Sequence, residues 1–307
     1  INCSFEAVTR NALFLGDNSL LLFSDCVFNS TSENIVIQGE VKNIDITHCQ
    51  FTTPERAVVC SFGQGINFSY NLFKNCGSLF AFQSVKHLKI EHNIADSVEN
   101  TFPAISLNYV EDFSFQYNKL STHSIFTLHG TYLIGINGCN SGTSMFMNNV
   151  INQRIDGGYE NAIALYGSNN ILFYHNTIQC NSSDTTSSVI RLDFSRNNVF
   201  KNNIVTNSNN GYCFYFYSST DNISDHNNLF TKKGKYLVNS DGVNYEDLLS
   251  WQQASSSDFH SISRSSFFLS PTDLHSHNVL LKSSGVNIGN ILPLDLDGLN
   301  RDIIKPD

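Results

Sequence analysis

The sequence predicts an all-β solenoid, a right-handed parallel β-helix of about ten coils, with a small C-terminal capping segment that contains one short helix. Three observations predict this fold. An eight-residue unit recurs along most of the chain, a second apolar segment in each repeat alternates with period two, and a single window has the pattern of a helix. Two or three short strands per repeat cannot enclose a core alone, whereas stacked repeats can.

The recurring unit has the form apolar-x-apolar-x-x-Asn-x-apolar. Clear copies are "INFSYNLF", "LKIEHNIA", "FSFQYNKL" and "ILFYHNTI", and looser copies are "SMFMNNVI", "NVFKNNIV" and "NISDHNNL". The asparagines, which recur every 22 to 31 residues, are Asn71, Asn93, Asn118, Asn149, Asn176, Asn203 and Asn227. Upstream, Cys3, Cys26 and Cys49 take the same place. Because a buried amide without a partner costs about 1 to 3 kcal/mol, we expect these side chains to form a hydrogen-bonded ladder and to tolerate the left-handed backbone of the bends.

The second segment appears as "NIVIQG", "SLFAFQ", "SIFTLH", "NAIALY", "SVIRLD" and "YCFYFY". This alternation, bounded by Gly, Asn, Ser and Asp, indicates strands, since a helix needs apolar residues three and four apart. Parallel coils stack at roughly 4.8 Å, and the crossover preference of parallel strands predicts a right-handed solenoid.

The pattern divides the chain into two regions. We expect residues 1–232 to form the β-helix and residues 233–307 to form the C-terminal cap, with a helix over Asn244–Gln253. Because the opening "INCSF" already lies within a repeat, we also expect the polypeptide to extend upstream of Ile1.

Composition narrows the classes of partner. With 27 acidic and 18 basic residues and a net charge of −9, the chain lacks the basic excess that nucleic acid binding requires. No run approaches the ~18 apolar residues of a membrane span. The eight cysteines contain no Cys-x-x-Cys pair, which argues against a thiolate zinc site. We expect mostly buried free thiols, with a Cys60–Cys76 bridge as the alternative.

These repeats resemble the right-handed parallel β-helix superfamily, which includes pectate lyases, polygalacturonases, alginate lyases and many non-enzymatic surface proteins. The resemblance covers Ile1 to about Phe230. The tail, with "DFHSISRSSFF", "DLHSHNVLLKSSGVNIGN" and "DLDGLNRDIIKPD", resembles the closing segment of secreted bacterial β-helix proteins, although "SSGVNIG" replaces their Ser-Pro-Ala run. The resemblance implies export and attachment to a bacterial cell surface. We expect a polysaccharide or a cell-surface protein as the partner.

Catalytic motifs of the superfamily are missing from the sequence, which has neither the Asp-Asp pair with Gly-His-Gly of polygalacturonases nor the Arg-x-Pro-x-x-Arg of pectate lyases. Candidate residues come instead from the outward face of the second segment. If Ile163 and Leu165 point inward, the residues that follow each of them in the strand point outward. These outward residues align with the equivalent residues of successive coils in two rows. The rows are Thr127, Ala164, Arg191 and Tyr215, and His129, Tyr166, Asp193 and Tyr217.

The candidate ligand-binding residues are therefore His129, Tyr166, Arg191, Asp193, Tyr215 and Tyr217. Aromatic faces beside an arginine and a carboxylate suit sugar rings and their hydroxyl or carboxylate groups. If the site is catalytic, Arg191 neutralises a uronate while Asp193, His129 or Tyr166 transfers protons. A structural interpretation competes, because tyrosine favours any strand and Arg191 can simply pair with Asp193.

Two further clusters have candidate roles. The loop "NQRIDGGYENAI" offers Asp156 and Glu160, with Arg154, as weak candidates for calcium binding or acid/base chemistry, against a solvated turn. No other cofactor is indicated. A row of rings that precedes the asparagines predicts stacking between coils rather than a metal array, because its histidines skip coils. The row is His48, Tyr70, His92, Tyr117, His175 and His226.

Two functions of different class remain open. The first is a non-catalytic, adhesin-like surface module that binds polysaccharide or a surface partner, and the second is a polysaccharide lyase or hydrolase that acts on an acidic glycan. A binding module predicts a shallow aromatic face, whereas an enzyme predicts a deep groove with acidic and basic groups around one sugar. The missing motifs and the surface-type tail favour the binding module.

Overall fold

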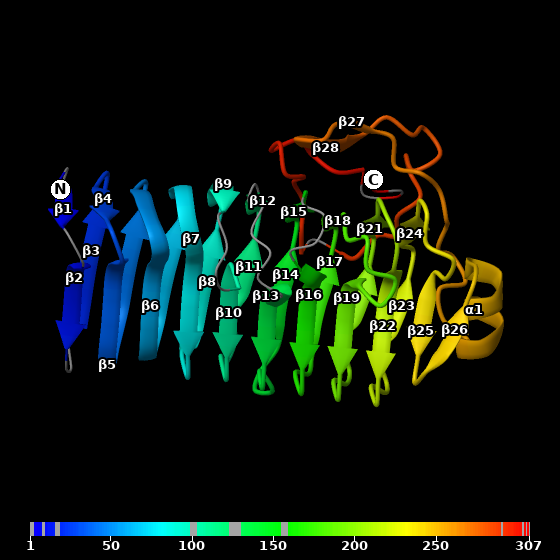
Figure 1. Ribbon diagram of the computed structural model, residues 1–307, viewed down its shortest axis with the longest axis horizontal. Coiled ribbons are helices and arrows are strands. Elements are labelled where there is room, and N and C mark those ends of the chain that lie inside the picture. Colours follow the sequence, from blue (N-terminus) through cyan, green and yellow to red (C-terminus); the bar gives the residue numbers. More distant parts are fainter. Residues whose placement is uncertain are drawn as a thin grey trace.

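The computed structural model describes residues 3–7, 10–15, 19–98, 103–122, 130–154, 159–289, 291–302, 304 and 306. Within these ranges the chain forms an elongated rod of stacked coils, with short parallel strands side by side along its length (Figure 1). The predicted β-solenoid with one short helix near its C-terminal end is confirmed.

The strands fall into three columns, and the long strands β5, β6 and β7 cross turns and enter more than one of them. The first column contains β2 (Arg10–Leu15), β5 (Glu33–Thr47), β6 (Gln50–Ser69), β7 (Leu72–Gln83), β10 (Ile105–Asn108), β13 (Gly130–Asn137), β16 (Tyr159–Tyr166), β19 (Ser188–Asp193), β22 (Tyr212–Tyr217) and β25 (Val238–Ser240). The second contains β3 (Ser19–Ser24), β5, β6, β8 (Lys86–Glu91), β11 (Ser114–Gln116), β14 (Ser144–Met147), β17 (Ile171–Tyr174), β20 (Val199–Lys201) and β23 (Ile223–Asp225). The third contains β1 (Ser4–Ala7), β4 (Val27–Ser30), β6, β7, β9 (Ile94–Val98), β12 (Lys119–Thr122), β15 (Val150–Gln153), β18 (Thr177–Cys180), β21 (Ile204–Asn207) and β24 (Asn228–Thr231).

Stacked phenylalanines run through the core. In the third column, Phe51 lies between Phe28 and Phe73 with ring centroids 5.0 and 4.8 Å away. In the second column, Phe173 and Phe200 stack at 4.7 Å. Because successive coils place like residues in register, each apolar position repeats as a buried column. The eight cysteines of the described chain form no disulfide bond, and seven are buried, so the Cys60–Cys76 bridge does not form.

The predicted asparagine ladder is confirmed. The Asn176 side chain donates to Phe146 O at 2.8 Å and to Asn203 Oδ1 at 3.0 Å, and its own Oδ1 accepts from the backbone N–H of Asn149 at 3.0 Å. The same three contacts recur from Asn71 to Asn203. The expectation that these asparagines adopt the left-handed backbone was wrong. That conformation belongs to the preceding residue, for example Tyr70 (φ 59°) and His175 (φ 54°).

The rod ends in a hairpin and a helix. Strand β26 (Val243–Tyr245) pairs antiparallel with β25, and α1 (Leu248–Ser255) follows. Trp251 of α1 is buried and stacks on Phe216 of the last coils at 5.7 Å, so the helix covers apolar surface there. The predicted start of the helix at Asn244 was wrong, because Asp247 is the N-cap and forms a capping box with Ser250.

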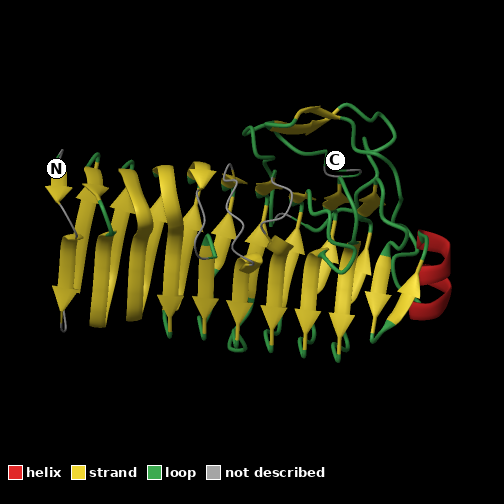
Figure 2. Cartoon of the chain, viewed as in Figure 1, coloured by secondary structure: helices red, strands yellow, loops and turns green. Residues whose placement is uncertain are grey.

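The remaining chain does not stay at the end of the rod. After α1 it runs back along the third-column side and forms a hairpin of β27 (Phe268–Ser270) and β28 (Asp273–Ser276) (Figures 1 and 2). Near its end, Pro306 O accepts from the backbone N–H of Gly285 at 3.0 Å. We call residues 258–306 the tail. Rod asparagines hold its backbone at several points: Asn228 binds Arg264 N and O at 2.9 Å each, and Asn202 binds Val286 N and O at 2.9 and 2.7 Å. The domain division at residue 232 stays a prediction.

Candidate functional site

The outward face of the first column carries most of the predicted ligand-binding residues. Arg191 pairs in register with Tyr215, and Asp193 pairs in register with Tyr166 on one side and Tyr217 on the other. The inward neighbours Ile163 and Leu165 are buried. The alignment of these five outward residues over three successive strands is therefore confirmed.

The predicted place of His129 in this alignment was wrong. The residue that pairs with Tyr166 from the preceding coil is Asn137, and Gly135 pairs with Ala164 where Thr127 was expected. The segment after His129 contains a second alternating run, whose Ile134 and Ile136 fill the core position. His129 itself lies outside the described residues, as does Thr127.

Arg191 is held from two directions. Its Nε lies 2.9 and 3.1 Å from the two carboxylate oxygens of Asp193, and its guanidinium carbon lies 4.6 Å from the centroid of the Tyr215 ring. The side chains of Arg191 and Asp193 are 31% and 20% exposed, so the pair is partly shielded from solvent. Neither Nη atom of Arg191 has a protein hydrogen-bond partner among the described residues. A fixed guanidinium with donors to spare is suited to a carboxylate or to paired hydroxyl groups.

An aromatic ridge borders this face. Tyr166, Phe194 and Tyr217 are 56%, 47% and 45% exposed, and Phe194 meets each tyrosine edge to face with centroids at 5.6 and 5.3 Å. Phe194 follows β19 with a left-handed backbone (φ 53°), which turns its ring outward beside the strand residues. Alternation within strands could not reveal this residue, because it belongs to the turn.

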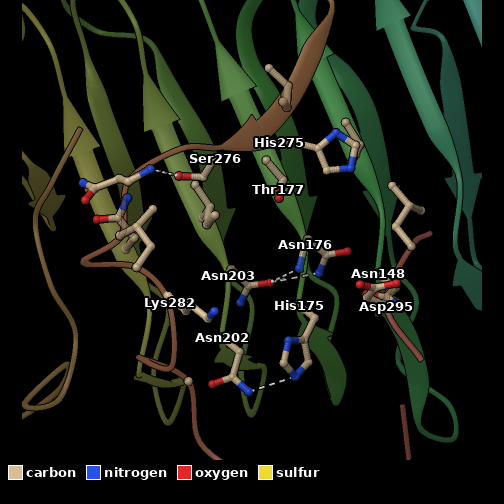
Figure 3. Close-up of a pocket in the computed structure, with 18 of the residues that line it drawn as sticks. Asn148, His175, Asn176, Thr177, Asn202, Asn203, His275, Ser276, Lys282 and Asp295 are labelled. Carbon is tan, nitrogen blue, oxygen red and sulfur yellow. Dashed lines mark hydrogen bonds between the residues drawn. The ribbon is translucent and has the colours of Figure 1, made fainter. Parts of the chain in front are cut away.

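A cleft of about 720 Å³ lies elsewhere, between the tail and the rod (Figure 3). The rod contributes turn and third-column residues, including His175 and Thr177, and the tail contributes β28 and the segment up to Arg301. Asn148 and Asn202 hold the tail over the cleft: Asn148 donates to Leu294 O at 2.9 Å and accepts from Arg301, and Asn202 donates to Val286 O at 2.7 Å. Within the rod, Asn202 also lies 2.9 Å from His175 Nε2.

His275 is the titratable centre of the cleft wall. Its Nδ1 bonds Asp273, and its Nε2 lies 2.7 Å from Asp297 Oδ2. Lys119 of the rod lies 3.8 Å from Asp297. The hydrogen bond to Asp273 raises the pKa of His275 most, partial burial opposes this, and Asp297 adds to the increase. The His275 imidazole therefore lies between two carboxylates of the tail, and Asp297 connects this group to Lys119 of the rod.

The sequence signal for the cleft was present but was interpreted only as architecture. Doubled asparagines occur at Asn148–Asn149, Asn202–Asn203 and Asn227–Asn228, in the copies of the repeat that match its pattern less closely. One member of each pair forms the ladder and the other holds the tail.

Two predictions remain, the calcium site at Asp156 and Glu160 and the row of stacked rings, and only the second can be checked in the described structure. Asp156 lies outside the described residues, and although Glu160 belongs to β16, nothing in the described structure tests the calcium hypothesis at these two residues. The predicted ring row is confirmed over four coils, where His48, Tyr70, His92 and Tyr117 stack with centroids 5.2, 4.6 and 4.7 Å apart.

Residues 1–145 match the family model described as a right handed beta helix region. Two crystal structures of mutants of the periplasmic alginate epimerase AlgG are similar, at 12% identity and a TM-score of 0.39 for one and 13% and 0.34 for the other. Each alignment covers 67% of this chain, which spans only 57% and 58% of those chains. No curated protein matches.

The protein is an elongated right-handed β-solenoid. The outward face of its first column carries Arg191 and exposed aromatic rings, and the tail lies along another side of the rod. Within the described chain, no helix reaches the length and apolarity that crossing a membrane demands.

Proposed function

We propose that this protein is an extracellular, adhesin-like β-helix module that binds polysaccharide on the first-column face without cleaving it. The observation that carries the proposal is Arg191, which is fixed by Asp193 and Tyr215 and lies beside a ridge of exposed aromatic rings. Aromatic surface with a few placed polar groups is the usual composition of a sugar site. The tail's resemblance to the closing segments of secreted bacterial proteins supports a cell-surface location.

The repeat of the rod supports a polymeric ligand. Coils follow one another at roughly 4.8 Å, so residues at equivalent outward positions repeat at that interval along the axis. A polysaccharide also presents the same chemical groups at regular intervals along its length. Residues Asn108 and Asn137 continue the same row beyond Tyr166, and their side chains bond each other at 2.8 Å. A glycan chain lying along this row would contact several coils at once.

The mutual pairing of Arg191 and Asp193 supports binding over catalysis. A carboxylate that already accepts two contacts from Nε is less available as a general base than an unpaired one. The same pairing holds the guanidinium still, which lowers the entropy lost when a ligand binds.

A second candidate function is a lyase or hydrolase that acts on an acidic glycan, and the cleft favours it. Lys119, His275 and the aspartates Asp273 and Asp297 place cationic and proton-transferring groups around one volume. That volume lies within the range of small-ligand sites, about 300 to 1,000 Å³.

The test is a glycan-array screen of the full chain, followed by titration calorimetry with each hit for wild type, Arg191→Ala and Tyr70→Ala. Tyr70 is an exposed tyrosine on another side of the rod and serves as the control. Loss of a charge-assisted contact worth about 1.5 to 3 kcal/mol predicts about a tenfold to hundredfold weaker Kd for Arg191→Ala only. Release of unsaturated uronides or new reducing ends, abolished by His275→Ala but not by Arg191→Ala, would support the enzyme and overturn the binding module.

A further inference from the structure

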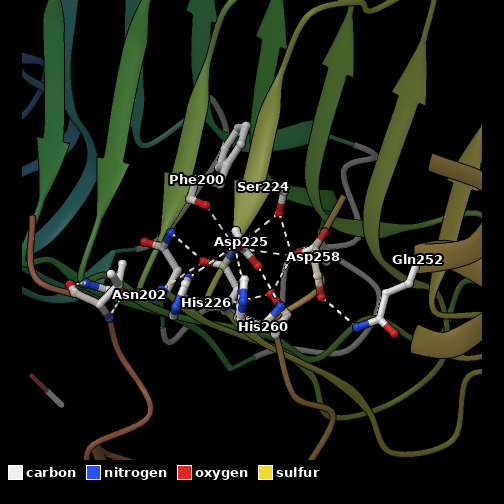
Figure 4. Close-up of polar contacts among 12 residues, drawn as sticks. Phe200, Asn202, Ser224, Asp225, His226, Gln252, Asp258 and His260 are labelled. Carbon is white, nitrogen blue, oxygen red and sulfur yellow. Dashed lines mark hydrogen bonds and ion pairs between the residues drawn. The ribbon is translucent and has the colours of Figure 1, made fainter. Parts of the chain in front are cut away.

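A cluster of potential metal ligands lies where the chain leaves the last coils. It includes no residue of the Arg191 face, and of its three members only His226 also lines the cleft. Asp225 ends β23, His226 follows it, and His260 comes from the tail just after α1 (Figure 4). One ligand atom from each of the three side chains lies within 4.8 Å of the other two. Among the described residues, no other group of three histidine, cysteine or acidic side chains meets this criterion.

Local backbone geometry brings two consecutive residues to the same side. Successive residues of a strand point to opposite faces, but His226 has a left-handed backbone (φ 57°) at the turn, which redirects its side chain. Its Nδ1 lies 3.2 Å from Asp225 Oδ2. The two side chains therefore present an imidazole nitrogen and a carboxylate oxygen to one point.

The tail supplies the third group with its position already fixed. The backbone N–H of His260 donates to Asp225 Oδ1 at 2.8 Å, and His260 Nδ1 lies 2.8 Å from Asp225 Oδ2. The His226 and His260 rings are 4.7 Å apart at their centroids. Hydrogen bonds to the non-ligating atom of a carboxylate orient it as they do in established metal sites.

An unsatisfied atom marks the same place. His226 Nδ1 is buried and makes no hydrogen bond, although it lies 3.2 Å from Asp225 Oδ2. A buried polar atom without a partner costs about 1 to 3 kcal/mol and calls for an explanation. A cation that accepted the lone pair of this nitrogen would supply the missing interaction.

We propose that Asp225, His226 and His260 bind one divalent transition-metal ion, of which Zn²⁺ is the natural probe, and that this ion fastens the tail to the rod. Two imidazoles and one carboxylate suit zinc and related ions rather than calcium or magnesium. In a tetrahedral site with ligands at about 2.1 Å, the ligand atoms are separated by roughly 3.4 Å, close to the spacing of Asp225 Oδ2 from both imidazoles. His260 is 67% exposed, so the fourth coordination position is accessible to water or to another ligand.

The test uses the full chain, treated with a chelator and dialysed. Zn²⁺ is titrated in competition with a chromogenic chelator into wild type, His260→Ala, Asp225→Asn and His87→Ala. His87 is the matched control, since it lies 3.5 Å from Asp112 as a histidine–carboxylate pair and belongs to no group of three. Asp225→Asn keeps an acceptor for the His260 N–H while it removes the charged ligand.

We expect one ion per chain in wild type and in His87→Ala, and at least about a tenfold loss of affinity in both site variants, with Zn²⁺ raising the Tm only where it binds. Trp251 fluorescence checks that each variant retains the packing of α1. X-ray absorption at the zinc edge should show two imidazole ligands. Equal affinities in all four proteins, or no saturable binding in wild type, would overturn the proposal, and neither result bears on polysaccharide binding at Arg191.

Discussion

The turn position before the asparagine ladder is filled differently in the two halves of the rod. In the first half it holds His48, Tyr70, His92 and Tyr117, whose rings stack from coil to coil at the surface. In the second half it holds Asn148, His175, Asn202 and His226, and there the tail lies across it. All eight residues share the same left-handed backbone, with φ between 54° and 59°.

One backbone position therefore serves two roles according to what covers it. Where the surface is bare, flat rings stack on each other and shield the turn, and partial burial lowers the pKa of His92. Where the tail returns, an amide replaces the ring at two positions, because an amide side chain can donate to and accept from an adjacent backbone simultaneously. The fold is set by the ladder and core beneath, which both halves share.

The largest effect should come from the shared ladder, with no difference between the halves. Asn176→Ala removes the donor to Phe146 O and the acceptor of Asn149 N, and Asn93→Ala does the same to Phe68 O and Asn71 N. Each leaves buried backbone groups unsatisfied, so we expect a loss of about 2 to 5 kcal/mol in unfolding free energy for both, measured by urea unfolding. A loss in only one half would mean that the ladder is not common to them.

A smaller effect, confined to the second half, should follow release of the tail. Asn202→Ala removes both contacts to Val286, and we expect faster hydrogen exchange at the Val286 amide and faster proteolysis of the tail, with a local cost of about 1 to 2 kcal/mol. Amides of the ladder, such as that of Asn93, are the internal control and should keep their protection. Unchanged exchange at Val286 would contradict the role of Asn202.

Tail attachment should also depend on pH. The folded pKa of His275 is raised, so its contribution is complete below about 6.5 and is lost as pH rises through the higher folded value. Its partner Asp273 has a lowered pKa, chiefly through the backbone N–H of His275, so that contribution exists above about 3.8 and is lost as pH falls through the folded value. As pH rises from neutral to alkaline, NMR titration should show His275 losing its proton over the same range in which proteolysis of the tail becomes faster. In His275→Gln, the rate of proteolysis should show no such dependence on pH.

The smallest effect should come from the ring stack. Tyr70 is 53% exposed and contacts His48 and His92, so Tyr70→Ala should cost about 1 kcal/mol and leave the tail as protected as in wild type. Urea unfolding and tail proteolysis measure the two quantities. A cost as large as that of Asn93→Ala would place the stack among the principal determinants of the fold.

The sequence was sufficient for the solenoid, the ladder and the register of Arg191 with Tyr215, because a strict repeat puts the same residue type at the same position in each coil. It was insufficient for His129, since two neighbouring alternating runs compete for one strand and only packing selects the run that contains Ile134. The path of the tail was also out of reach. It depends on contacts between residues far apart in the sequence, such as Asn228 with Arg264, 36 positions away, and Asn202 with Val286, 84 positions away, which no local pattern encodes.

The most direct test of the central claim is calorimetric titration of the best array glycan into wild type, Arg191→Ala and Tyr70→Ala. The account predicts saturable binding that is at least about tenfold weaker in Arg191→Ala and unchanged in Tyr70→Ala, without new reducing ends or unsaturated products. Equal binding by all three proteins would mean that the first-column face is not the site.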